Sequence, residues 1–323
     1  MTTLHIAKDG SGDFTSVSQA LASLPADSQT PVTLRIHRGI YKERITITSP
    51  YLTLEGDSPE TTVLTFDLYA RMPMEDGKKR GTFRSYSCLI DTHDFTARNL
   101  TFENSAGPGS QVGQALALYV DGDRILFENC RFLGGQDTLF TGPLPPREIE
   151  PDGFIGPKQH APRVNGRHCY RNCYIEGDID FIFGSATAYF ENCECFSKDD
   201  GRPISSYVTA ASTPEGQTYG YVMKNCRFTG NCPPASAYLG RPWRDWAKTV
   251  LIDCYMDRHI CPEGWNDWNK PAARENCFFA EYGSTGPGAV MERRPDWVKR
   301  LSAEDLSHYE KALVLDGTDG WNP

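Results

Sequence analysis

The sequence lacks the features that mark several common classes of protein. None of its apolar runs approaches the ~18 residues that a membrane-spanning helix requires, so we expect no membrane partner. Lysine and arginine number 33 against 42 acidic residues, which gives a formal net charge of −9, and they form no basic stripe. This balance argues against nucleic acid as a partner. It does not argue against anionic sugars, which a few local groups can bind in an acidic protein.

Two common types of reaction centre are also missing. The sequence has no Gly-x-Ser-x-Gly elbow, and its seven histidines fall outside the motifs described below. Its eleven cysteines include no paired Cys-x-x-Cys knuckles, so Cys169 with Cys173, and Cys193 with Cys195, are not expected to bind zinc. We therefore expect neither a metal nor another cofactor.

A secretory leader is not visible either. The first residues, Met-Thr-Thr-Leu-His-Ile-Ala, do not combine a basic head with an apolar core. The number of cysteines is odd, and most stand at one position of a repeat, which favours buried free thiols over disulfides. Together these observations predict a cytoplasmic protein. The alternative is a secreted or periplasmic protein whose leader has been removed.

What the sequence contains instead is a recurring Asn-Cys unit. An earlier version without cysteine covers residues 100–104. The cysteines of the unit are 43, 20, 33, 28 and 23 residues apart, an irregular period close to one coil of a solenoid. The units are Asn129-Cys130, Asn172-Cys173, Asn192-Cys193, Asn225-Cys226, Asp253-Cys254 and Asn276-Cys277.

The units are short and strand-like, and no long helical pattern separates them, which predicts an all-β fold. A parallel β-helix fits best, with inward Asn and Cys side chains stacked in ladders; a β-sandwich is the alternative. We expect one domain over residues 1–323, in which Phe14–Leu24 forms a short helix that caps the open end. The tail, residues 291–323, is partly helical over Ser302–Leu313 and is expected to pack on the solenoid.

Two aspartates follow this unit at the same distance. Six residues separate Cys130 from Asp137, and six separate Cys173 from Asp180. If Asn-Cys marks one structural position, the aspartates lie on neighbouring coils, roughly 4.8 Å apart on the same face. This register alone is not diagnostic, because Asp200 also falls seven residues after a repeat cysteine and turns often carry aspartate.

The motifs around the aspartates resemble those of the pectin methylesterases (pectinesterases), carbohydrate esterase family 8. The resemblance implies a right-handed parallel β-helix that hydrolyses methyl esters of galacturonate in pectin or methylated oligogalacturonides and releases methanol. Supporting segments in family order are residues 7–14, 81–85 and 113–118. The main motifs are Gly135-Gln136-Asp137-Thr138-Leu139, Asp180-Phe181-Ile182-Phe183-Gly184 and Leu239-Gly240-Arg241-Pro242-Trp243.

Ester hydrolysis needs a nucleophile, an acid for the leaving alcohol, and donors for an anionic intermediate. Two aspartates about 5 Å apart in a water-poor groove cannot both ionise easily. The resemblance pairs Arg241 with Asp180, which makes Asp180 the ionised nucleophile and Asp137 the acid. Gln136 and Gln114 offer amide donors to the oxyanion, and the resemblance makes Gln136 the main stabiliser.

Substrate contacts also follow from the resemblance. Trp243 carries an indole, and an indole beside a groove is suited to stacking on the apolar face of a sugar ring. Phe140, Phe183 and Tyr207 are further candidates for the groove, although each is equally plausible as packing. The contacts that the resemblance implies are Thr82, Gln114, Arg241 and Trp243.

The segment Gly142–Gly166 holds six prolines and is read as an inserted loop, extended and fairly stiff, that borders the groove. Its Lys158, His160 and Arg163 either meet galacturonate carboxylates or lie in a solvated loop. We expect a monomer.

Other functions stay open. A β-helix glycosidase also uses carboxylates about 5 Å apart, but its cationic transition state would gain little from paired glutamine donors. An esterase or thioesterase of another substrate, and a non-catalytic sugar-binding solenoid, are the remaining alternatives.

Overall fold

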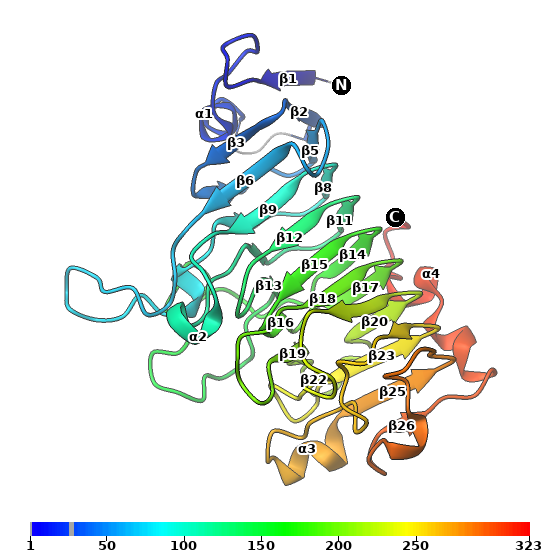
Figure 1. Ribbon diagram of the computed structural model, residues 1–323. Coiled ribbons are helices and arrows are strands. Elements are labelled where there is room, and N and C mark those ends of the chain that lie inside the picture. Colours follow the sequence, from blue (N-terminus) through cyan, green and yellow to red (C-terminus); the bar gives the residue numbers. More distant parts are fainter. Residues whose placement is uncertain (1, 26–28) are drawn as a thin grey trace.

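The computed structural model describes residues 2–25 and 29–323 and shows a solenoid of stacked coils (Figure 1). Within these residues the named strands form three sheets, and every pairing between them is parallel. Consecutive strands of a sheet come from successive coils. The prediction of an all-β parallel β-helix is confirmed.

Most coils contribute one strand to each of the three sheets. In the described chain, the eleven-stranded sheet comprises β1 (Thr2–Ile6), β2 (Val32–Ile36), β5 (Leu52–Gly56), β8 (Phe95–Arg98), β11 (Ile125–Glu128), β14 (Arg167–Arg171), β17 (Thr187–Glu191), β20 (Tyr221–Lys224), β23 (Lys248–Ile252), β25 (Phe278–Tyr282) and β26 (Lys299–Arg300). The eight-stranded sheet of the same residues comprises β3 (Gly39–Lys42), β6 (Thr62–Phe66), β9 (Thr101–Asn104), β12 (Arg131–Leu133), β15 (Tyr174–Gly177), β18 (Glu194–Ser197), β21 (Arg227–Gly230) and β24 (Tyr255–Met256). The seven-stranded sheet, counted likewise, comprises β4 (Ile45–Ile47), β7 (Cys88–Ile90), β10 (Leu118–Val120), β13 (Leu139–Thr141), β16 (Ile179–Gly184), β19 (Ser206–Ala211) and β22 (Ala237–Gly240).

The helices are short and occupy connections and the two ends of the solenoid (Figure 1). None of those in the described ranges is long and apolar enough to cross a membrane. They are α1 (Val17–Ala22), α2 (Gly109–Val112), α3 (Pro271–Asn276) and α4 (Lys311–Val314), with 3-10 turns η1 (Thr82–Arg84), η2 (Met291–Arg293) and η3 (Asp305–Tyr309).

The Asn-Cys unit forms the turn between the eleven-stranded and eight-stranded sheets. Asn129 lies between β11 and β12 with φ 51°, and Asn172 and Asn192 adopt φ 53° and 54° at the same place in later coils. Asparagine enters this left-handed region more readily than most residues, which explains its recurrence. The prediction that these asparagines point inward is wrong: their side chains are exposed, and Asn192 donates to Asn172 Oδ1 at 3.4 Å.

The cysteine of each unit does point inward, as predicted. Cys130 donates its thiol hydrogen to the Ala97 carbonyl of the preceding coil, with Sγ 3.4 Å from the oxygen, and Cys193 lies 3.4 Å from the Tyr170 carbonyl oxygen. A small thiol fills the corner beside the turn and adds a weak hydrogen bond to a backbone oxygen of the preceding coil. All eleven cysteines are buried and unpaired, as expected.

Two of the proposed units are not copies of this turn. Asn104 is buried at the end of β9, where its Nδ2 donates to the carbonyls of Leu68, Ser85 and Leu116. Its coil places Asn99, with φ 56°, at the turn instead. Asn276 ends α3 and therefore belongs to a helix.

The helix at the N-terminal end is shorter than the expected Phe14–Leu24. Phe14 is extended, because Ala7 donates its amide to the Phe14 carbonyl at 2.9 Å. The α1 helix begins after Ser16, whose hydroxyl accepts from the Gln19 amide at 3.1 Å, and it buries Val17 against the core.

The tail packs along the outside of the eleven-stranded sheet. Its helical part is limited to η3 and α4. Val314 and Leu315 are buried against that sheet, and Asp319 forms ion pairs with Arg124 at 3.0 Å and Arg167 at 2.5 Å. Figure 1 shows the C-terminus returning to the middle of the solenoid.

The inserted loop leaves the solenoid between β13 and β14 (Figure 1). Its last part, residues 158–163, forms a tight turn held by one arginine. Arg163 donates to the carbonyls of Lys158, Gln159 and Ala161, at 2.9, 2.8 and 2.6 Å, and closes the loop on itself. The prolines supply turns here, because each fixes only its own φ.

Candidate active site

Asp137 and Asp180 occupy equivalent positions on neighbouring coils. Leu139 of β13 pairs with Ile182 of β16, so the register that aligns these strands also aligns the two aspartates. The Asp137 amide donates to the Ile179 carbonyl at 3.0 Å. Both aspartates adopt positive φ, 64° and 51°, which is uncommon for residues other than glycine. The register argument drawn from the cysteines therefore predicts the right pair.

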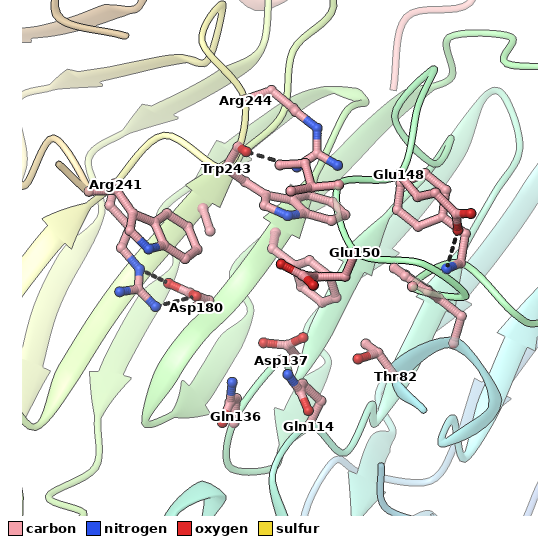
Figure 2. A pocket seen from close by; sticks show the side chains of 17 residues that line it. Thr82, Gln114, Gln136, Asp137, Glu148, Glu150, Asp180, Arg241, Trp243 and Arg244 are labelled. Carbon is pink, nitrogen blue, oxygen red and sulfur yellow. Dashed lines mark hydrogen bonds and ion pairs between the residues drawn. The ribbon is translucent and has the colours of Figure 1, made fainter. Parts of the chain in front are cut away.

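A guanidinium group holds one member of this pair. Arg241, just after β22, donates from Nε to Asp180 Oδ1 at 2.8 Å and from Nη2 to Oδ2 at 2.6 Å (Figure 2). Two rings enclose the guanidinium: its carbon lies 3.9 Å from the centroid of Tyr207 and 3.7 Å from that of Trp268. Such a stacked, bidentate arginine has little freedom to leave its partner.

The surroundings of the two aspartates give their carboxyl groups different pKa values. Burial raises the pKa of Asp137 well above its ordinary value, the charge of Asp180 adds to this rise, and Arg241 offsets only part of it. Burial also raises the pKa of Asp180, but the charge and the hydrogen bonds of Arg241 counteract it. As the pH rises, Asp180 therefore loses its proton at a lower pH than Asp137 does.

Two glutamines stand next to the pair. Gln136 precedes Asp137, and its backbone pairs with that of Gln114 on the preceding coil, where Ala115 donates to the Gln136 carbonyl at 3.0 Å. Both side chains line the same cavity as the aspartates, and Figure 2 shows their amide nitrogens directed to the aspartate side. Amide groups in this place can donate hydrogen bonds to an oxygen that becomes negative in the cavity.

A buried carboxyl group that sequence reasoning missed lies beside the same glycine as Gln136. Asp178 accepts hydrogen bonds from the amides of Gly109 at 2.8 Å and Ile179 at 2.7 Å. A Cβ at Gly109 would lie 2.6 Å from both Asp178 Oδ1 and Gln136 Cβ, so only glycine allows the chain to approach this closely. Asp178 lies two residues before Asp180, which is the only sequence signal that could have indicated it.

The cavity has a volume of about 430 Å³ and an aromatic wall. Trp243 and Phe183 meet at the wall with ring centroids 5.6 Å apart. Phe140 is fully buried beneath it, and Tyr207 supports Arg241 outside the cavity lining. The residues that line the cavity are Thr82, Phe83, Gln114, Gln136, Asp137, Glu148, Ile149, Glu150, Gly153, Phe154, Asp180, Phe183, Ala210, Arg241, Trp243, Arg244 and Trp268. The proposed catalytic residues and the substrate contacts implied by the resemblance are among them, as is Phe183, whereas Phe140 and Tyr207 are not.

The inserted loop borders the cavity, as expected, but its basic residues do not line it. Lys158 pairs with Asp91 at 2.5 Å, and Arg163 is occupied by the carbonyls of its own loop. The loop instead contributes acidic and apolar side chains, Glu148, Ile149, Glu150 and Phe154. Of the two alternatives for Lys158, His160 and Arg163, the one without a substrate contact fits the structure, since none of the three lines the cavity.

Two residues that the sequence did not reveal, Arg244 in the cavity lining and Lys270 outside it, support the turn around Trp243. Arg244 donates to the Trp243 carbonyl at 2.9 Å and to the Arg147 carbonyl of the inserted loop at 3.1 Å. Lys270 donates to the Pro242 carbonyl at 2.8 Å and lies 4.5 Å from the Trp268 ring centroid. None of these positions stands in a recognisable motif.

The described residues contain no group of three or more histidine, cysteine, aspartate or glutamate side chains placed to hold a metal ion.

Comparisons with known proteins agree on one family. The family model described as Pectinesterase matches residues 3–144 and 162–317, so residues 145–161 of the inserted loop fall outside the match. "Pectinesterase 31" from Arabidopsis thaliana is 36% identical over 320 residues, which cover 97% of this chain and 92% of that protein.

Solved structures share the fold over nearly the whole chain. Pectin methylesterase PemA from Erwinia chrysanthemi aligns with a TM-score of 0.79 and 31% identity over 100% of this chain and 98% of its own. A pectin methylesterase in complex with hexasaccharide VII gives a TM-score of 0.80 with 31% identity over 100% and 98%. Carrot pectin methylesterase gives 0.80 with 28% identity over 98% and 93%. The fold is the right-handed parallel β-helix of these proteins.

Proposed function

Because the chain belongs to the pectinesterase family, it is a carboxylic ester hydrolase that removes methyl esters from galacturonate residues, and we propose that Asp180 and Asp137 carry the reaction. The observation that supports this assignment is the bidentate Arg241–Asp180 pair, beside a second aspartate at the same register whose own pKa is raised. The surroundings thus favour the ionised form more strongly in Asp180 than in Asp137, so that one carboxyl group can attack while the other donates a proton, as nucleophilic ester hydrolysis requires.

In the first half of the reaction, an oxygen of Asp180 attacks the carbonyl carbon of the ester. The carbonyl oxygen becomes negative and receives hydrogen bonds from the amide of Gln136, with Gln114 beside it. When the tetrahedral intermediate collapses, Asp137 gives its proton to the methoxy oxygen. Methanol leaves, and the galacturonyl group is bound to Asp180 as an anhydride.

In the second half, the Asp137 carboxylate takes a proton from a water molecule. The hydroxyl part of this water adds to the carbonyl carbon, and the bond to the Asp180 oxygen breaks. Asp180 regains its carboxylate, Asp137 regains its proton, and galacturonic acid is released and loses its own proton to solvent. The balance of the two halves is one water consumed for each methanol and acid formed.

Trp243 and Phe183 form the wall on which a sugar ring can stack, and Thr82 lies at the opposite edge of the cavity (Figure 2). Solved pectin methylesterases with bound hexasaccharides support a pectin-derived substrate for the groove. We expect it to be methyl-esterified galacturonan or oligogalacturonide.

A glycosidase is the second candidate, since it also uses a carboxylate pair. The amides of Gln114 and Gln136 favour the esterase, because they can stabilise an anion but not the cationic transition state of glycoside cleavage. The test is the product. Asp180→Asn should abolish methanol release from methylated pectin, and the wild-type protein should form no new reducing ends. Near-normal methanol release by Asp180→Asn would refute the proposed nucleophile.

We further propose that the protein acts as a monomer in the cytoplasm on imported methylated oligogalacturonides. Support for the compartment comes from the eleven buried, unpaired cysteines, since exported proteins commonly convert such thiols to disulfides. Thiol titration of the unfolded protein, purified without reductant, should find eleven free sulfhydryls. Stable disulfides would favour export, and a light-scattering mass of twice the 36.1 kDa chain would exclude the monomer.

A further inference from the structure

The part of the inserted loop that the family model does not match brings two acids into the groove. Glu148 and Glu150 line the cavity that holds Asp137 and Asp180. Figure 2 shows Glu150 pointing into the cavity, on the same side of the view as Trp243 and Asp137. A groove for a polymer of acidic sugars would ordinarily gain affinity from basic side chains, so two glutamates at this point call for an explanation.

The loop that bears these glutamates is fastened to the rest of the protein. Phe154 packs against Phe83 and Trp243, with ring centroids 5.8 and 6.3 Å apart. The Phe154 amide donates to Glu148 Oε2 at 3.3 Å, which orients that carboxylate. The ion pair of Lys158 with Asp91 fixes the far side of the loop. The two carboxylates therefore stand at a fixed edge of the groove.

The cations nearby are already engaged. Among the described residues that line the cavity, four are acidic and two are arginines. Arg241 is paired with Asp180, and Arg244 donates to two backbone carbonyls and stacks on Trp243, 4.6 Å from the ring centroid. With Asp137 protonated, the carboxylates still outnumber the guanidinium groups. Without the glutamates of the loop, the balance would be reversed.

The same edge also offers apolar contacts. Ile149, between the two glutamates, is 64% exposed and lines the cavity, and Phe154 also lines it. A methyl ester is uncharged and gains from such neighbours, whereas a free galacturonate would bring a further negative charge to the acids.

We propose that Glu148 and Glu150 make the sugar-binding position under the inserted loop select a methyl-esterified residue over an ionised one. This inference rests on the proposed function and names the substrate class of the same site. A galacturonate whose ester has already been hydrolysed then binds weakly at this position, so the next ester on the same chain is bound less well. The protein would attack densely esterified chains and slow down as free acids accumulate beside the remaining esters.

The size of the effect follows from Coulomb's law. Two like charges about 6 Å apart, at an effective dielectric constant between about 20 and 80, change a binding constant by roughly 3-fold to 100-fold. We take about tenfold as the expected discrimination. Exposed charges are screened by salt, so the discrimination should shrink as ionic strength rises from about 0.05 to 0.5 M.

The experiment compares two hexagalacturonides of equal length, one fully methyl-esterified and one with esters and free acids alternating. The ratio of kcat/KM per ester for methanol release is measured for the wild type, for the double variant Glu148→Gln/Glu150→Gln, and for the matched control Glu60→Gln. Glu60 is an exposed acid in the turn before β6 and does not line the groove. The wild type and the control should prefer the fully esterified hexamer about tenfold more than the double variant does.

The salt dependence separates charge from shape. In the wild type the preference should fall with added salt, and in the double variant it should stay level. An active double variant with the wild-type ratio and salt response would overturn the inference while the esterase function stands. Failure of the wild type to release methanol from either hexamer would instead overturn the proposed function itself.

Discussion

Arg241 holds Asp180 through two parallel hydrogen bonds, of 2.8 and 2.6 Å, that engage both carboxylate oxygens. Each oxygen of a carboxylate has a second lone pair, so this pairing fixes the direction of the group without removing its capacity to attack. The nucleophile is thus aimed by a cation that is itself enclosed between Tyr207 and Trp268.

Arg241→Gln tests this arrangement through the pH profile. Arg241 counteracts the rise in the pKa of Asp180 that burial causes. Without the guanidinium the pKa of Asp180 should rise further, and the acid limb of kcat/KM, which requires ionised Asp180, should move to higher pH. The measurement is methanol release from about pH 4 to 9. A variant that is merely less active, with an unmoved acid limb, would show that Arg241 does not control this ionisation.

Gln136→Ala tests the oxyanion donor. We expect kcat to fall by roughly 10²–10³, the usual loss for one donor, while KM changes little, because the negative charge develops only in the transition state. Gln114→Ala provides the comparison and should lose less. Equal losses in the two variants would mean that the glutamines share the role.

Asp137→Asn should stabilise the folded protein near neutral pH. The folded-state pKa of Asp137 lies well above the ordinary value of 3.8, so between these two values the folded state binds a proton that the unfolded chain has released. Stability is therefore lost in the wild type as the pH rises through this interval. Urea unfolding should show the variant to be more stable at pH 7 and the difference to disappear below about pH 4. The same variant should be inactive.

The asparagine turns can be tested by a matched pair of substitutions. Asn192 adopts φ 54°, a conformation that costs residues with an ordinary Cβ about 1–2 kcal/mol. Asn192→Ala should reduce the free energy of unfolding by about 1 kcal/mol, and Asn192→Gly by clearly less, because glycine enters this region freely. The readout is equilibrium urea denaturation. A glycine variant as unstable as the alanine variant would point to the Asn192–Asn172 hydrogen bond as the source of the loss.

Part of the site could be predicted from the sequence because, in a solenoid, residues at the same distance from a repeated residue lie at equivalent positions on their coils. The cysteine of each turn is fixed by the interior corner, so a constant offset from Cys130 and Cys173 leads to Asp137 and Asp180. The rule has a limit at Asp200, which has the same offset from Cys193. β18 ends at Ser197, and Asp200 lies in the loop beyond it, with one carboxylate oxygen accepting from the Arg202 amide.

Other parts of the site could not be predicted because they depend on contacts between distant coils. Trp268 and Tyr207 enclose Arg241, yet neither stands in a motif or at a repeat position. In the inserted loop, prolines indicate that regular structure stops but not which side chains turn inward. The sequence therefore left open whether Lys158 and Arg163 reach the groove. In the structure Asp91 and the carbonyls of the loop itself bind these two residues, and Glu148 and Glu150 stand at the edge of the groove instead.

The ion pairs of Asp319 with Arg124 and Arg167 have a consequence for the solenoid as a whole. In a stacked repeat each coil touches only its neighbours, so an end coil can fray without disturbing the rest. Here the last residues of the chain return to coils that lie more than a hundred residues earlier, and they cover every coil between. Before the C-terminal coils can unfold, the ion pairs of Asp319 with Arg124 and Arg167 must break. The coils that carry the two aspartates are therefore bound into one cooperative unit with the end of the chain.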